Sequence, residues 1–342
     1  MPRQSPCRNP TNLAGRAFSL VELLTVIGIL AIVMAIVLPA MNSARRTAKM
    51  ADTRATLASL QQSCSTFNTD NRRDPGYFSP KDMGASANAT AGFDSMSNIM
   101  LDLMGGVVSP SATGTGVITV GPGTTMGTTQ VKVDLAGFGA SHQSTTSGAV
   151  VKNYFVADSK KMVAQDPALG QRFGTGAGTG GAILPSLVDA FGQPILAWVQ
   201  DNPNAQNFAL DASPAVSSPS TDAQFYWNQN AGFLNSGVTK LGRIAESQAY
   251  ASGGSLLASD NSAPNRLNTL AALLGNPAAP DSTTPTKPAS PRGPIVFHSA
   301  GADGVFVGKR DRGGNSGVRT YTANKDDFNG ALFDDQIMSA GH

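Results

Sequence analysis

The chain has 342 residues and a formal net charge of +2, with 25 basic and 23 acidic residues. So small a net charge gives no indication of a nucleic-acid partner, and none is predicted. The length suits one membrane anchor and one soluble domain of ordinary size, and 37 glycines and 21 prolines indicate that much of this domain is loop.

A short polar leader, residues 1–17, precedes an apolar run, residues 18–38. The leader has no acid, and its basic residues are Arg3, Arg8 and Arg16. At about 1.5 Å per helical residue the apolar run reaches roughly 31 Å, close to the hydrocarbon thickness of a bilayer. A secretory signal peptide has its small-residue cleavage site after the apolar run, whereas Gly15 and Ala17 precede it here. Cleavage at these residues would leave the apolar run on the mature chain.

Glu22 is an acid inside this otherwise lipid-compatible run. A charge in a membrane-spanning helix costs a few kcal/mol or more unless it is paired, so Glu22 is expected to have a partner. The alternative is an acid at the membrane interface, whose charge reaches the headgroups.

The run that starts at Ala17 reads Ala-Phe-Ser-Leu-Val-Glu-Leu and resembles the prepilin signature of type IV pilins and type II secretion pseudopilins. The resemblance implies cleavage between Ala17 and Phe18 by a prepilin peptidase, and methylation of the new amine of Phe18. In this family an acid stands four residues after that Phe, as Glu22 does here. The family usually has Gly before the cut, where this chain has Ala17. Pro39 matches a proline common in these helices, so Glu22 and Pro39 are the implied assembly residues.

The resemblance also implies a location and partners. The leader would lie in the cytoplasm, residues 18–39 would cross the inner membrane once, and the remaining chain would be periplasmic. The implied partners are copies of this chain and other pilin-like subunits in a helical filament, an inner-membrane assembly platform and membrane lipid. Charge counting alone leaves the orientation open, because basic residues follow the span and balance those of the leader. These are Arg45, Arg46 and Lys49.

The sequence predicts that the helix continues through residues 40–71, which contain no proline, to a total of about 50 residues and roughly 75 Å. Two rows of apolar residues recur at helical spacing. The small row is Met41, Ala44, Ala48, Ala51, Ala55 and Ala58. The bulky row is Leu57, Leu60, Cys64 and Phe67. The small row suits the approach of another subunit and the bulky row suits the core of the protein's own domain; alternatively, both rows pack on that domain.

The resemblance implies that residues 72–342 form a pilin-like globular domain. The expected fold class is therefore α+β, with a long N-terminal helix packed on a small antiparallel β-sheet domain. A helix is expected over residues 94–104, with Asp94 or Ser95 as its N-cap. A Gly/Ser/Thr-rich insertion, about residues 105–181, contains three candidate strands. These are residues 117–120, 131–135 and 150–156.

The second half of the domain begins with Asp189-Ala190-Phe191-Gly192-Gln193-Pro194, which is similar to a turn of major pseudopilins and leads into an apolar strand, residues 195–198. Residues 224–227 predict another strand and residues 267–274 a helix. A proline-rich connector, residues 277–294, then leads to the C-terminal loop.

The C-terminal loop, residues 295–342, begins in the segment 294–306, where two short strands are expected to flank a tight glycine-rich turn. Its Ser-Ala-Gly-Ala-Asp-Gly core resembles the loop that holds calcium in major pseudopilins. Calcium takes six to eight oxygen ligands. The implied ligands here are Asp303, Asp326 and Asp327. The chain departs from the family by an insertion of residues 308–324, and the alternative is that these aspartates are turn formers and solvated surface.

No enzyme is predicted. The three histidines have no metal-ligand spacing, and neither a G-x-S-x-G motif nor a P-loop lysine occurs. The first hypothesis is a filament subunit, most closely a type II secretion pseudopilin. A minor or adhesive pilin is the second, favoured by the enlarged middle region. A membrane-tethered periplasmic binding or catalytic domain is the third.

Overall fold

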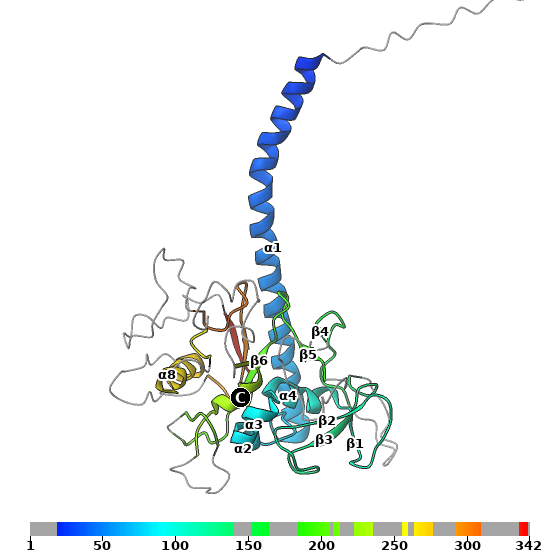
Figure 1. Ribbon diagram of the computed structural model, residues 1–342, viewed down its shortest axis with the longest axis vertical. Helices are drawn as coiled ribbons and strands as arrows, with labels where there is room; N and C mark the ends of the chain where they lie inside the picture. Colours follow the sequence, from blue (N-terminus) through cyan, green and yellow to red (C-terminus); the bar gives the residue numbers. More distant parts are fainter. Residues whose placement is uncertain are drawn as a thin grey trace, which may run out of the picture. The chain divides into compact units, whose positions relative to one another are not determined.

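The computed structural model describes residues 19–139, 152–163, 184–205, 208–212, 222–234, 255–258, 263–275, 292–308 and 335–340. Its elements are labelled in Figure 1. The chain forms two compact units, Met1–Ala48 and Lys49–His342. The fold class is α+β, since a long N-terminal helix precedes small antiparallel sheets.

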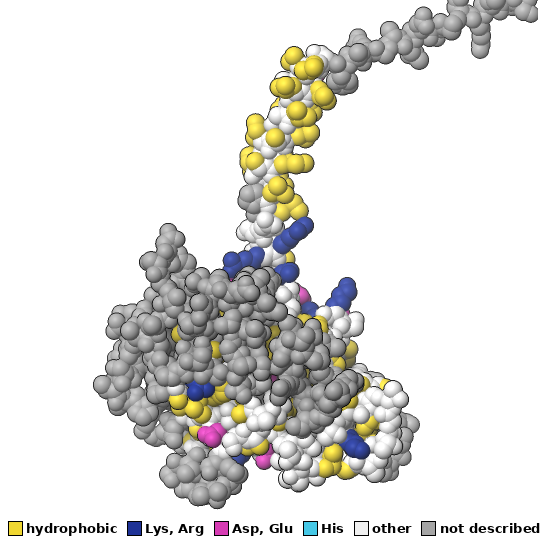
Figure 2. All heavy atoms as spheres, in the orientation of Figure 1, with side chains coloured by type: hydrophobic (Ala, Val, Ile, Leu, Met, Phe, Trp, Pro, Cys, Tyr) yellow, Lys and Arg dark blue, Asp and Glu magenta, His cyan; other side chains and the backbone are white. Residues whose placement is uncertain are grey.

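The long helix α1 (Leu20–Asn71) has 52 residues, which confirms that the apolar run continues as helix to residue 71. Its first part is long and apolar enough to cross a membrane, and none of this apolar stretch is buried. In Figure 2 hydrophobic side chains follow this part of the helix. Arg72 has a left-handed backbone with φ 59°, and α1 ends immediately before it.

The two apolar rows predicted on α1 differ in burial. Every member of the bulky row is buried, and this row packs with α4 and the central sheet in one core cluster. In the small row Ala51, Ala55 and Ala58 are exposed. The alternative in which both rows pack on the same domain is therefore wrong.

Three short helices follow: α2 (Pro80–Gly84), α3 (Ser86–Ala91) and α4 (Ser95–Met104). The prediction for α4 is confirmed. The Asp94 carboxylate accepts hydrogen bonds from the backbone N–H and the hydroxyl of Ser97, both at 2.8 Å, and so caps the helix. The helix ends at Gly105, whose φ is 72°.

The strands form three small antiparallel sheets. The first has the order β1-β3-β2, with β1 (Val107–Val108), β2 (Val117–Val120) and β3 (Val131–Asp134). The second pairs β4 (Met162–Val163) with β5 (Ser186–Leu187). The third has the order β6-β7-β8, with β6 (Leu196–Val199), β7 (Ile295–Ser299) and β8 (Gln336–Ala340).

The central β6-β7-β8 sheet is covered on both faces. Side chains alternate between faces along a strand, so Leu196 and Trp198 belong to one core cluster and Ala197 and Val199 to another. The first cluster also contains residues of η2 (Trp227–Asn230), α5 (Ala231–Leu234) and α8 (Ala263–Leu274). The second contains the bulky row of α1. β6 and β7 are therefore buried along their length rather than alternately, whereas the middle of β8 is half-buried.

Three strand predictions were wrong. Residues 152–156, the described part of the candidate strand 150–156, form no strand. Tyr226 makes one isolated bridge to Ala209, and the chain then turns into η2, so residues 224–227 are not a strand. Of the two strands expected around the glycine-rich turn, the first forms as β7 and the second does not, because β7 pairs with β6 and β8 instead of with the segment after the turn.

Candidate functional site

Glu22 lies in the first turn of α1 and is exposed. Its carboxylate accepts a hydrogen bond from the backbone N–H of Ser19 at 2.9 Å, and the Thr25 hydroxyl donates to its carbonyl at 3.0 Å. Ser19 and Glu22 have the S-x-x-E spacing of a capping box, in which the acid satisfies a backbone donor that the helix leaves unpaired. Sequence reasoning missed this role, although the spacing was its signal.

The helix that follows Glu22 presents a continuous apolar surface. Leu20 is 77% exposed, Ile32 65% and Ile36 70%, and the large apolar side chains between them are exposed as well. Contiguous exposed apolar surface of this kind marks contact with lipid or with other proteins. Ala17 and Phe18 lie outside the described residues, and Pro39 falls within α1.

The predicted calcium loop is described in part. Gly301 and Gly304 have φ values of 70° and 76°, and they bracket a turn in which the Asp303 carboxylate accepts from the backbone N–H of Val305 at 2.8 Å. Asp326 and Asp327 lie outside the described residues. Within the part of the chain that is described, no three His, Cys, Asp or Glu side chains come together as a metal site. One turn aspartate is less than calcium requires, so the site stays a prediction.

Two buried polar contacts hold the strands next to this turn. The imidazole of His298, on β7, hydrogen-bonds to the carboxylate of Asp335, and both side chains are buried. The same carboxylate accepts from the backbone N–H of Val307 at 2.9 Å. Asp335, immediately before β8, thus ties β7 to the segment after the turn.

The second contact joins Asp189 to Ser299, whose hydroxyl donates to the carboxylate at 2.6 Å. The other oxygen of Asp189 accepts from the backbone N–H groups of Phe191 and Gln193 at 2.8 and 2.9 Å. Burial raises the pKa of Asp189 above its usual range, against the effect of these hydrogen bonds. This carboxylate therefore organises the turn that leads into β6.

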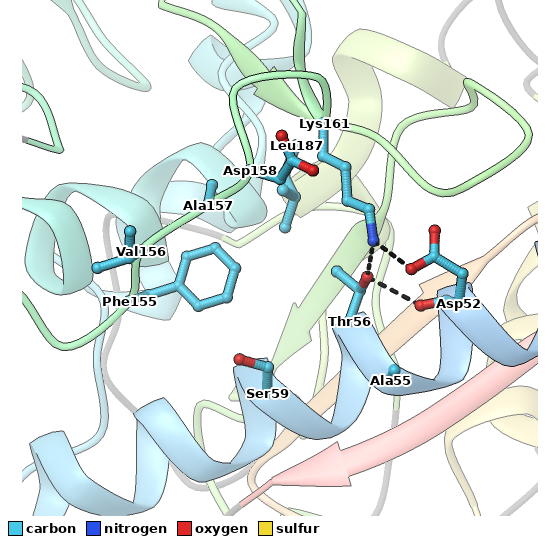
Figure 3. A pocket seen from close by; sticks show the side chains of 10 residues that line it. All are labelled: Asp52, Ala55, Thr56, Ser59, Phe155, Val156, Ala157, Asp158, Lys161 and Leu187. Carbon is cyan, nitrogen blue, oxygen red and sulfur yellow. Dashed lines mark hydrogen bonds and ion pairs between the residues drawn. The ribbon is translucent and has the colours of Figure 1, made fainter.

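An open groove of about 250 Å³ lies between α1 and the segment before β4 (Figure 3). The ammonium of Lys161 lies 2.7 Å from the carboxylate of Asp52 and 2.7 Å from the hydroxyl of Thr56. Through these two contacts Lys161 joins the segment before β4 to α1. The groove is a polar surface feature with an apolar wall formed by Phe155 and Leu187.

No family model, curated protein or solved structure matches the chain.

Proposed function

We propose that this protein is a structural subunit of a type IV pilus-like filament, most closely a type II secretion pseudopilin. The subunit is anchored in the inner membrane with its N-terminus in the cytoplasm and its domain in the periplasm. A prepilin peptidase cleaves between Ala17 and Phe18, and the new amine of Phe18 is methylated. The mature chain then leaves the bilayer and enters the filament through α1.

The observation that carries the proposal is the exposed apolar part of α1, which begins with an acid in its first turn. A helix that only anchors a domain needs apolar residues and no acid, because a charge near lipid is costly. A helix that packs against identical helices can use an acid if the neighbour brings a cation. The new N-terminal amine, on Phe18, is such a cation.

The spacing of the two charges sets the axial register between neighbouring subunits. Glu22 stands four positions after Phe18, which corresponds to about 6 Å along a helix. A neighbouring subunit displaced by this distance brings its amine level with Glu22. Neither charge is stable alone in a low-dielectric surrounding, whereas the pair neutralises itself. The contact fixes the axial register, and the exposed apolar side chains of α1 supply most of the adhesion.

The test combines the mature N-terminus with filament assembly. Mass spectrometry of the membrane-bound chain should find a start at methylated Phe18. Glu22→Leu and Glu22→Ala should leave insertion and cleavage intact, because the span becomes only more apolar. They should sharply reduce filaments, since removal of one partner of a buried charge pair costs roughly 3–5 kcal/mol.

Membrane fractionation of each variant is the control. A start two residues earlier, at Arg16, would move the cut, and a start beyond Leu38 would overturn the proposal. Normal filaments from Glu22→Leu would show that Glu22 acts only as a cap or an interfacial acid.

A further inference from the structure

The groove beside α1 has the features of a receptor for a long cationic side chain. The wall opposite α1 carries the apolar groups of Val156, which is exposed, and Ala157, which is half-buried, together with the Phe155 ring (Figure 3). Such a wall suits the methylene stem of a lysine, which packs on apolar surface while its ammonium stays with polar groups. A volume of about 250 Å³ is many times the roughly 10–15 Å³ that a single water needs, so the groove has room for one such side chain.

The charge of the groove favours a cation. Its lining contains two carboxylates, Asp52 and Asp158, and one ammonium, Lys161, which leaves a net charge of −1. The Asp52 side chain remains 50% exposed although it pairs with Lys161. An incoming ammonium would therefore find a carboxylate at the surface of α1.

The chain itself contains a candidate for this cation, Lys49, which lies shortly before Asp52 on α1. Lys49 is exposed on α1. Its ammonium lies over the Phe191 ring, 5.4 Å from the ring centre. Lys49 precedes Asp52 by three residues, about 4.5 Å along the helix, and Phe18 precedes Glu22 by four, about 6 Å. In both pairs the acid follows the cation. A neighbouring copy displaced by about 5–6 Å along the helix axis therefore aligns both pairs. The two required displacements differ only by the rise of one residue, which a flexible lysine side chain can span.

We infer that this groove is a docking site for a second copy of the chain, whose Lys49 enters beside Asp52 while its N-terminal amine meets Glu22. The inference rests on the proposed filament and adds to it a contact outside the membrane-spanning part. The exposed small residue Ala55 lines the site, and exposed Ala51 lies one helical turn before it on α1, so a second helix can approach closely. Two pairs with one displacement specify the register more strongly than one pair does.

Crosslinking in cells tests the register directly. Two differently tagged copies of the full chain are co-expressed, one with Lys49→Cys and the other with Asp52→Cys, and treated with a short bis-maleimide. Cys7 is replaced by Ser in both copies, and Cys64 is buried and unreactive. A crosslinked dimer is expected. The matched control pairs Lys49→Cys with Ser59→Cys, an exposed position of the same groove seven residues further on, and should yield at least tenfold less dimer.

Charge reversal tests the contact without cysteines. Lys49→Glu should reduce filament yield at least tenfold, and Lys49→Glu together with Asp52→Lys should recover it. Arg54→Glu is the matched control, because Arg54 is also exposed on α1 but does not line the groove, and it should assemble normally.

Electron microscopy of the parent strain separates failure of the groove contact from failure of the filament itself. If filaments form but the 49/52 pair links no better than the 49/59 pair, the inference is overturned and the filament stands. Normal assembly of Lys49→Glu has the same meaning. If the parent chain forms no filaments, the proposed function itself is wrong.

Discussion

The carboxylate of Glu22 and the backbone N–H of Ser19 are joined by a hydrogen bond of 2.9 Å that closes the first turn of α1. The residue proposed to set the filament register therefore also caps its own helix. The two roles are compatible, since a carboxylate has two oxygens and each can accept more than one hydrogen bond. They also differ in what they need, because a cap requires an acceptor and the register contact requires a charge.

Glu22→Gln separates these roles. Glutamine serves a capping box as well as glutamate does, and it cannot neutralise a neighbouring amine. We expect Glu22→Gln to leave the helicity of α1 unchanged by circular dichroism in detergent and to reduce filament yield as strongly as Glu22→Leu does. Wild-type assembly of the Gln variant would assign Glu22 to capping alone.

The two rows of α1 predict opposite behaviour of neighbouring positions. Leu60 is fully buried, so Leu60→Ala should lower the free energy of unfolding by about 2–5 kcal/mol. Ala58 is exposed, so Ala58→Leu should change it by less than about 0.5 kcal/mol. Urea unfolding of residues 49–342 measures both.

In the proposed filament Ala58→Leu should impair assembly although it hardly changes the free energy of unfolding. Ala58→Leu adds bulk where another subunit approaches, and it should lower filament yield in an otherwise stable chain. Normal filaments from Ala58→Leu would contradict a packing role for the small row.

The sequence predicted features that depend on neighbouring residues. The burial of Leu60 and Phe67 followed from helical spacing, and the cap at Asp94 followed from one polar residue before an apolar run. The Ser19–Glu22 cap belongs to the same class and was missed because the acid was weighed only against the membrane.

Features that depend on distant residues could not be predicted. β7 pairs with β8, whose residues lie after a long intervening segment, and an alternation pattern cannot identify such a partner. β6 shows no alternation at all, because both of its faces are buried. The contact between His298 and Asp335 follows from that strand pairing and had no sequence signal of its own.

The resemblance leads us to propose that the C-terminal loop binds calcium. A thermal melting experiment tests this proposal. If Asp303, Asp326 and Asp327 share the ion, residues 49–342 should melt several degrees higher in millimolar calcium than in chelator, because a ligand of the folded state alone raises stability. Asp303→Ala should abolish the difference. Asp211→Ala, at an exposed aspartate outside the loop, is the control and should retain it. Equal melting curves would leave the loop aspartates as turn residues.

Acid pH should stabilise the folded domain of residues 49–342 through Asp94. Burial raises the pKa of this carboxyl from 3.8 to about 6, although the hydrogen bonds from Ser97 act in the opposite direction. Between these values the unfolded chain has released the proton and the folded chain still holds it. The free energy of unfolding should therefore fall as pH rises from about 4 to about 6, and the loss should be complete above that window.

The size of the effect and its source can both be measured. The rise of the Asp94 pKa from 3.8 to about 6 corresponds to about 3 kcal/mol of unfolding free energy, and the raised pKa of Asp189 acts in the same direction. Asp94→Asn keeps an oxygen to accept from Ser97 and has no proton to release. Urea unfolding of residues 49–342 across this pH range should therefore give a shallower slope for Asp94→Asn than for the parent chain. The two should differ most at neutral pH, where the parent alone buries a charge at this helix end. Identical slopes would mean that Asp94 ionises as easily in the fold as in the unfolded chain.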